Sequence, residues 1–347
     1  MSRRPGDLVF SALFGLTLLL SLSNLPAARA DLVPPSTNLG NPGAGGILDY
    51  SRVHPVIARR DDVADSVYTD NAVGYPSVGL LAVGSSVRAS GTLIAPNVVL
   101  TAAHVFDAGS PVNTIFFTVG GSTYDVQTVV LSPTWTGFNA SIGKGDDIAM
   151  IVLTSRVTNV APASLYTGTD ELGHVGIDVG FGYSGTGSTG HSGDFGTKRA
   201  GPNSVDQFGD FFNNVSHNIL LQDFDKPGDP NLSTFGSTTP LAQESLITQG
   251  DSGGGMFIDF GTGPLLVGVH SFLDDQNNDG ILSNYGDIGG STRVSANLAF
   301  IETLVTVPEP ASFVLFALGI LGVGVAQAPL RKRNSRSNGP APADASC

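Results

Sequence analysis

The feature that most constrains the fold is a series of short apolar runs separated by turn residues. The runs are rich in Val, Ile and Thr and are bounded by Gly, Pro, Asn or Ser, which is the pattern of β-strands. A first set comprises 77–83, 92–94, 98–100, 114–119, 126–131 and 148–153. A second set comprises 175–181, 218–223, 254–258, 265–272 and 290–294. Two batches of about six strands predict two six-stranded antiparallel β-barrels, over about 75–158 and 159–295.

The composition also favours a turn-dense β protein. The chain has 45 glycines in 347 residues, and only 14% of its residues are charged, which suits tight turns better than long helices. One helix is expected after the last strand, because Leu298, Ile301 and Val305 fall at i, i+3 and i+7. The prediction is an all-β domain with a C-terminal amphipathic helix.

The N-terminal segment has the features of an export signal. Arg3 and Arg4 precede the apolar run 8–22, and Ala28-Arg29-Ala30 offers small residues around a cleavage site. This order predicts a secretory signal peptide over residues 1–30. The alternative is a membrane anchor, for which the run is short. Residues 31–74 are then expected to form a leader or pro-segment, which contains the basic pair Arg59-Arg60.

The C-terminal segment combines a short motif, an apolar stretch and a basic cluster. Val307-Pro308-Glu309-Pro310-Ala311 leads into the apolar residues 312–328, and Arg331-Lys332-Arg333 follows. Together they resemble the PEP-CTERM sorting signal of exopolysaccharide-producing Gram-negative bacteria, here residues 307–347. That resemblance implies processing by an exosortase-like enzyme and membrane contact through a transmembrane helix at 312–328. The alternative is a plain C-terminal anchor. Both place the body of the protein outside the cytoplasm, secreted, periplasmic or at the cell surface.

Charge and cysteine content limit the partners and the sources of stability. The net charge is −13, and much of the basic charge lies in the two terminal segments, so the exported body is strongly acidic. An acidic body argues against nucleic acid as a partner. The single cysteine is Cys347, beyond the predicted anchor, so we expect the folded body to have no disulfide bond despite its export.

The most specific segment ends in a histidine. Residues 90–103 read as a strand, a tight turn, a second strand and a small-residue turn that presents His104. An imidazole has a pKa near neutrality and is therefore the best general base for a hydroxyl nucleophile. A lone histidine would more often be structural. The string Thr-Ala-Ala-His directly after a strand favours the catalytic interpretation.

Two acidic residues are candidates for the partner of this histidine. Asp146 and Asp147 stand before the apolar strand that begins at Ile148. A carboxylate at the mouth of a buried strand can accept a hydrogen bond from the imidazole, fix its tautomer and stabilise the imidazolium. Asp147 directly precedes Ile-Ala, which resembles the arrangement in the chymotrypsin/trypsin-like serine peptidases. That resemblance favours Asp147, and Asp146 is interpreted as a solvated turn residue.

A glycine-rich turn supplies the candidate nucleophile. Gly250-Asp251-Ser252-Gly253 is followed by an apolar strand. The glycines allow a tight turn that exposes the Ser252 hydroxyl, and they let the Gly250 and Ser252 amides point together as an oxyanion hole. Such a run alone could be an ordinary loop. The two preceding segments, in the order His, Asp, Ser, favour the nucleophile.

These three strings resemble those of the chymotrypsin/trypsin-like serine peptidases. The resemblance covers roughly residues 75–305 and implies the double barrel, with His104 and Asp147 from the first barrel and Ser252 from the second. The peptidase domain is accordingly expected at 75–306. Residues 268–272 look like the family's substrate-pairing strand.

The chain also departs from the family pattern. Ala89 and Val105 occupy positions where many relatives have a disulfide bond, and no Ile-Val-Gly-Gly start precedes the first barrel. In the animal enzymes a freed amino terminus pairs with the aspartate before the serine, here Asp251. No partner of that kind is evident, although cleavage after Arg60 is conceivable.

Three residues are candidates for the primary substrate pocket. The resemblance places Leu246 at the pocket floor, where an aspartate would select Arg or Lys, so trypsin-like cleavage is not expected. His270 and Ser271 lie on the strand that lines the pocket. The glutamate-specific branch of the family has a histidine at the position of His270, so an acidic substrate side chain is one interpretation. A packed strand histidine is the other.

A last cluster has the character of a cation site. Asp275, Asn277 and Asp279 offer oxygens at alternating positions before a turn glycine, as at the start of an EF-hand loop. The glutamate expected at the twelfth position is missing, because Gly286 stands there and Asp287 follows. A structural Ca²⁺ site and an ordinary acidic turn both remain open.

The sequence therefore predicts a secreted serine endopeptidase that hydrolyses protein or peptide substrates through a Ser-His-Asp triad and an acyl-enzyme, with no required cofactor. The alternative is a catalytically silent surface protein that keeps the trypsin fold for binding or structure. An esterase or lipase is disfavoured by the order of the three residues and by the strand after Ser252.

Overall fold

The computed structural model describes residues 57–85, 87–236 and 239–305. The predicted signal peptide at 1–30, the sorting signal at 307–347 and its span at 312–328 lie outside these residues. No helix in the described ranges is long and apolar enough to cross a membrane.

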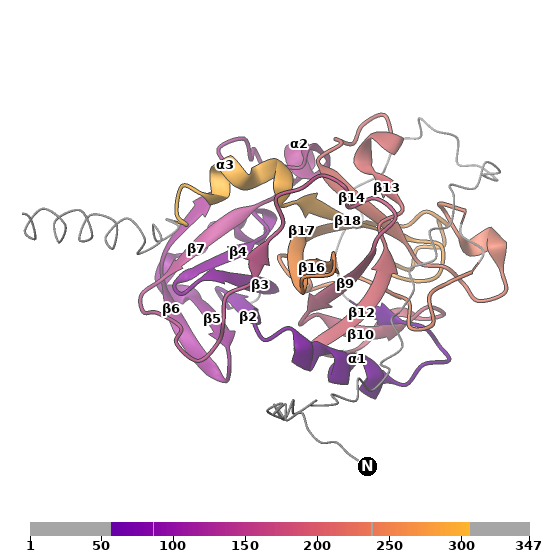
Figure 1. Cartoon of the computed structure of the whole chain (residues 1–347), viewed down its shortest axis with the longest axis horizontal. Coiled ribbons are helices and arrows are strands. Elements are labelled where there is room, and N and C mark those ends of the chain that lie inside the picture. The colour runs from indigo at the N-terminus through magenta and orange to yellow at the C-terminus, as the bar shows by residue number, and fades with distance from the viewer. Residues whose placement is uncertain (1–56, 86, 237–238, 306–347) are drawn as a thin grey trace, which may run out of the picture. The chain divides into compact units, whose positions relative to one another are not determined.

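The first half of the fold is a closed barrel, as predicted (Figure 1). The order around the barrel is β2-β3-β4-β7-β6-β5, and all neighbours are antiparallel. The strands are β2 (Val78–Val83), β3 (Val87–Ala95), β4 (Val98–Thr101), β5 (Ile115–Val119), β6 (Ser122–Leu131) and β7 (Ala149–Leu153). Each contains most or all of one of the apolar runs that predict the barrel.

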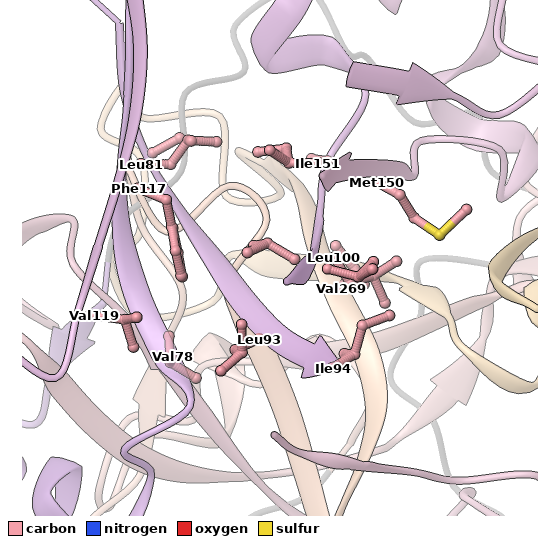
Figure 2. Packing of buried hydrophobic residues seen from close by; sticks show 14 of the residues in the cluster. Val78, Leu81, Leu93, Ile94, Leu100, Phe117, Val119, Met150, Ile151 and Val269 are labelled. Atoms are coloured by element: carbon pink, nitrogen blue, oxygen red, sulfur yellow. The ribbon is translucent and has the colours of Figure 1, made fainter. Parts of the chain in front are cut away.

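The barrel is filled by fully buried aliphatic and aromatic side chains. Leu81, Leu93, Leu100 and Phe117 come from four different strands and belong to one cluster (Figure 2). A Cβ on Gly79 would lie 2.5 Å from the Phe117 ring, so only a glycine leaves room for that ring. The same cluster includes residues of the second half, so one continuous core joins the two halves.

The second half differs from the predicted closed barrel. Its sheet has the order β12-β9-β16-β17-β18-β14-β13, and β8 pairs with β17. Among the described residues no ladder joins β12 to β13, so this sheet is curled but open. The strands are β8 (Ser164–Leu165), β9 (Val175–Gly180), β12 (Arg199–Ser204), β13 (Gln207–Phe208), β14 (Ile219–Asp223), β16 (Gly255–Asp259), β17 (Pro264–Asp274) and β18 (Ile288–Arg293).

A further four-stranded sheet was not predicted. Its order is β11-β10-β1-β15, with strands β1 (Ala58–Arg59), β10 (Tyr183–Thr186), β11 (Gly190–Phe195) and β15 (Ser245–Leu246). The strand β1 is parallel to β10 and antiparallel to β15. Part of the segment predicted as a leader is thus a strand between two strands of the second half.

The helices are short. They are α1 (Asp65–Asn71), α2 (Phe138–Ser141), α3 (Leu298–Ile301) and the 3-10 helices η2 (Ala72–Gly74), η3 (His104–Phe106), η4 (Val112–Thr114), η5 (Ile142–Lys144), η6 (Gly209–Phe211), η7 (Pro230–Leu232) and η8 (Ser295–Asn297). The helix α3 lies where an amphipathic helix is predicted. It is a single turn long and buries Ile301 completely.

Candidate active site

His104 begins the helix η3, which follows the barrel strand β4 after a two-residue turn. Ala102 and Ala103 are fully buried in the turn between them, which explains why only small side chains stand there. The Thr101 hydroxyl donates to the Ser90 carbonyl at 2.8 Å and ties this turn to β3. The local sequence therefore fixes the backbone from which the imidazole projects.

Asp147 holds this histidine in two ways. The residue is fully buried just before β7. Its Oδ1 accepts the His104 backbone N–H at 2.8 Å, and its Oδ2 lies 2.7 Å from His104 Nδ1. Ser271 on β17 also donates its hydroxyl to Oδ2, at 2.6 Å. One carboxylate thus satisfies three donors and links the barrel to the second sheet.

Ser252 completes a chain of three side chains. Its Oγ lies 2.9 Å from His104 Nε2. The Ser252 carbonyl accepts from the Ser90 amide at 2.9 Å, and the Gly253 amide donates to the His270 carbonyl at 2.9 Å. Gly253 has a φ of +81°, a conformation that favours glycine. The structure thus brings together all three residues that the sequence motifs single out.

The environment of His104 favours its protonated form. Burial alone would lower the pKa of the imidazole, but the charge and hydrogen bond of Asp147 outweigh this, so the pKa lies above its usual value of 6.5. The Phe138 ring packs edge-on against the imidazole, with 5.7 Å between ring centroids. The imidazole can therefore take up a proton from Ser252 and be stabilised as a cation.

The turn before Ser252 leaves two backbone donors free. Gly250 has a φ of +99°, and the Ser90 hydroxyl donates to its carbonyl at 2.9 Å. Within the described part of the chain, neither the Gly250 amide nor the Ser252 amide donates a hydrogen bond. Two such donors beside a nucleophile can stabilise a negatively charged oxygen.

Asp251 is held inside the protein by hydrogen bonds from backbone amides. The residue is fully buried, and its two oxygens accept the Gly182 amide at 3.0 Å and the Thr248 amide at 3.1 Å. Burial raises the pKa of this carboxyl to about 8, against the effect of the Gly182 hydrogen bond. Gly180 packs so closely that an added Cβ would lie 1.9 Å from Asp251 Oδ1.

The three candidate pocket residues have different surroundings. Leu246 is fully buried in an apolar cluster that includes Ala58 of β1. Ser271 directs its hydroxyl to Asp147. His270 is fully buried, with Nδ1 3.0 Å from Ser291 Oγ and Nε2 3.8 Å from Asp178 Oδ1. Burial lowers the pKa of His270 to about 3, so its imidazole is neutral.

The candidate cation residues lie in the loop between β17 and β18. Asp275, Asn277 and Asp279 follow β17 directly, and each accepts a backbone amide of the same loop. Among the described residues, no group of three or more His, Cys, Asp or Glu side chains converges to hold a metal ion.

Sequence reasoning missed one residue of the site. Ser90 donates its hydroxyl to the Gly250 carbonyl, accepts from the Phe181 amide at 2.9 Å, and donates its own amide to the Ser252 carbonyl. It therefore braces the turn that carries the candidate nucleophile. A single serine in a strand carries no signal of this role, because the contacts bridge more than 90 residues of sequence.

Comparison with known families gives two matches. The family described as Trypsin matches residues 66–301, a range that begins inside the predicted leader. The PEP-CTERM protein-sorting motif matches residues 306–332. No curated protein matches the chain.

Proposed function

Because the chain belongs to the trypsin family and carries a PEP-CTERM sorting motif, we propose that it is an exported serine endopeptidase with Ser252 as nucleophile. The observation that carries this proposal is the continuous hydrogen-bonded chain from Ser252 Oγ through His104 to Asp147, with separations of 2.9 and 2.7 Å. This arrangement activates a hydroxyl that is otherwise a weak nucleophile.

The proposed mechanism consists of acylation of Ser252 followed by deacylation, with His104 and Asp147 acting in both steps. Ser252 Oγ attacks the peptide carbonyl carbon while its proton passes to His104 Nε2, and Asp147 stabilises the imidazolium. The negative charge that develops on the carbonyl oxygen is stabilised by the Gly250 and Ser252 amides. His104 then donates its proton to the leaving amine, and an acyl-enzyme remains. Water, deprotonated by His104, releases the acyl group by the same steps in reverse.

We propose that this site needs no freed amino terminus. In the described structure two backbone amides satisfy Asp251, and β1 pairs with β10 and β15 as an internal segment of the chain. The strand β15 precedes the turn that carries Gly250, so β1 supports the segment from which the oxyanion donors project. Loss of the chain up to Arg60 would remove this support.

The sorting motif indicates the compartment in which the protein would encounter its substrate. A signal peptide over 1–30 and a PEP-CTERM tail at 307–347 imply export, processing by an exosortase-like enzyme and display at the surface of a Gram-negative cell. The natural substrates would then be proteins or peptides outside the cytoplasm. No cofactor enters the proposed reaction, because every proton and charge is handled by side chains and backbone amides.

A peptide library tests the proposed function. The purified protein and its Ser252→Ala variant are each incubated with the library, and new termini are identified by mass spectrometry. We expect cleavage by the parent protein only, and the residue before each cut gives the primary specificity. If the parent leaves the library intact while circular dichroism shows it folded, the silent binding protein becomes the better account. Equal cleavage by both proteins would point to a contaminating protease.

A further inference from the structure

The loop 275–287, which joins β17 to β18, wraps around its own side-chain oxygens. Asp275 accepts the Asp279 amide at 3.2 Å and the Gly280 amide at 2.9 Å. Asn277 Oδ1 accepts the Asp279 amide at 2.9 Å. Gly280 has a φ of +82°, which turns the chain back. These contacts give the loop its shape, but they do not by themselves indicate a ligand.

Two buried oxygen atoms of the same loop, which are not part of these contacts, do indicate a ligand. Asp287 is fully buried, and its Oδ1 has no hydrogen-bond partner among the described residues. The Ser283 hydroxyl is likewise fully buried and unpartnered within that part of the chain. A buried carboxylate oxygen without a donor costs free energy. Such an oxygen in a native fold therefore requires an explanation, and a bound cation at this loop provides one.

Asp287 lies against the acidic start of the loop. Its Oδ2 accepts the Asn284 amide at 3.2 Å. The side chain of Asn284 donates to Asp279 Oδ2 at 2.5 Å and accepts from Asn277 Nδ2 at 3.0 Å. Asn284 therefore connects the buried Asp287 with two of the three alternating positions, Asn277 and Asp279.

The charge around Asp279 and Asp287 also favours a cation. Lys226 lines the same pocket as Asn277 and Asp279, but its ammonium pairs with Asp229 at 3.9 Å. Among the described residues, no basic side chain forms an ion pair with Asp279 or Asp287.

We propose that this loop binds one Ca²⁺ through the side chains of Asp275, Asn277, Asp279 and Asp287. The Ser283 hydroxyl, which is buried in the same loop, and one backbone carbonyl of the loop would supply two further oxygens. Six hard oxygen ligands with three carboxylates match the preference of calcium. Asp287 takes the place of the glutamate that the EF-hand pattern has one position earlier.

Binding requires a small local rearrangement. The described carboxylates do not converge at ligand distance, and Asp279 Oδ2 accepts from Asn284. The ion would replace that donor and draw the Asp287 oxygen inward. Magnesium fits less well, because it demands octahedral geometry and gives up its water reluctantly.

The proposed site lies between two strands that reach the candidate active site. The strand β17 carries Ser271, whose hydroxyl donates to the Asp147 side chain, and β18 carries Thr292, whose hydroxyl donates to the Asp147 carbonyl at 3.2 Å. Calcium would fix the end of this strand pair. The role is structural, and it does not depend on whether the protein hydrolyses peptides.

Calcium titration of the full chain carrying Ser252→Ala tests the proposal without self-cleavage. Isothermal titration calorimetry should give one site, with a Kd of about 0.1–1 mM as in extracellular calcium modules. If the Kd is near 0.1 mM, 10 mM Ca²⁺ is about 100 times Kd and should raise the Tm by roughly 5–10 °C. The same concentration of Mg²⁺ should raise it much less.

Variants locate the site. Asp279→Ala changes an exposed residue and should abolish both the heat of binding and the Tm shift, as should the isosteric Asp287→Asn. Asp70→Asn removes a charge from an exposed position on α1 and should leave both intact. A parent protein with no calcium-dependent shift overturns the proposal. So does a shift that survives Asp279→Ala, a variant expected to fold even if Asp287→Asn does not.

Discussion

Replacing Asp147 by asparagine tests the proposed triad at its most constrained residue. The carboxylate accepts three hydrogen bonds, from the His104 amide, His104 Nδ1 and the Ser271 hydroxyl, at 2.8, 2.7 and 2.6 Å. An asparagine of the same shape has one acceptor oxygen and an NH₂ group that must face one of these donors. At least one donor therefore loses its acceptor in a fully buried position.

The size of the effect follows from the two roles of the carboxylate. Without it, the imidazolium is not stabilised and Nδ1 no longer has to carry the proton, so Nε2 is lost as a base. In trypsin-fold enzymes the corresponding change lowers kcat by about 10⁴-fold, equivalent to about 5.4 kcal/mol at 1.36 kcal/mol per decade. Protein stability should fall by about 1–3 kcal/mol, because a buried donor is left unsatisfied.

The assay compares kcat/KM on one peptide substrate for Asp147→Asn, Asp146→Asn and the parent, with urea unfolding to measure stability. Asp146 is the matched control, since it is the neighbouring carboxylate and has only partial burial. It should retain kcat/KM to within about twofold. The reasoning is refuted if Asp147→Asn keeps more than a tenth of the activity while folded, or if Asp146→Asn loses as much.

Three further predictions follow from the geometry. Removing the chain up to Arg60 deletes β1 and should lower kcat/KM roughly 100-fold through misplaced oxyanion donors; unchanged or increased activity would contradict the proposed support by β1. The pKa of His104 is raised despite its burial, and the base must be neutral, so kcat/KM should fall as pH decreases with a midpoint above 6.5, and a midpoint below 6.5 would be inconsistent. Gly180→Ala should cost about 1–3 kcal/mol of stability, because its Cβ would clash with Asp251. Gly74→Ala meets nothing within 4 Å and should be near neutral in the same urea unfolding measurement; equal effects would refute the packing argument.

The first barrel was predictable because each strand carries its own local signal. Its β-branched runs are bounded by turn residues, as in β4, where Pro96-Asn97 precedes Val98. The strands β10 and β11 were not predicted, because residues 182–196 are dominated by Gly and Ser and read as a loop. The two strands pair with each other as a hairpin, and β10 also pairs with β1, which comes from far away in the sequence. The open second sheet likewise depends on strand ladders that periodicity does not reveal.

Some residues of the candidate site could likewise be identified from the sequence, whereas others became evident only in the structure. His104, Asp147 and Ser252 each lie in a short motif whose residue types are required by their chemistry, so their identity was available from the sequence. The contribution of Ser90 was not, since it arises from contacts with Gly250 and Phe181 that only the folded chain creates. For the loop 275–287 the alternating oxygens were visible, but the burial of Asp287 beside them was not.

Labelling with a fluorophosphonate probe tests the central claim most directly, because such probes react with an activated serine hydroxyl rather than with an ordinary one. The parent protein, Ser252→Ala and the control Ser90→Ala are labelled and digested, and the modified peptide is sequenced by mass spectrometry. We predict one modified residue, Ser252, with no labelling of Ser252→Ala and slower labelling of Ser90→Ala. A folded parent that takes up no probe, or a label that persists in Ser252→Ala, would contradict the proposed serine peptidase.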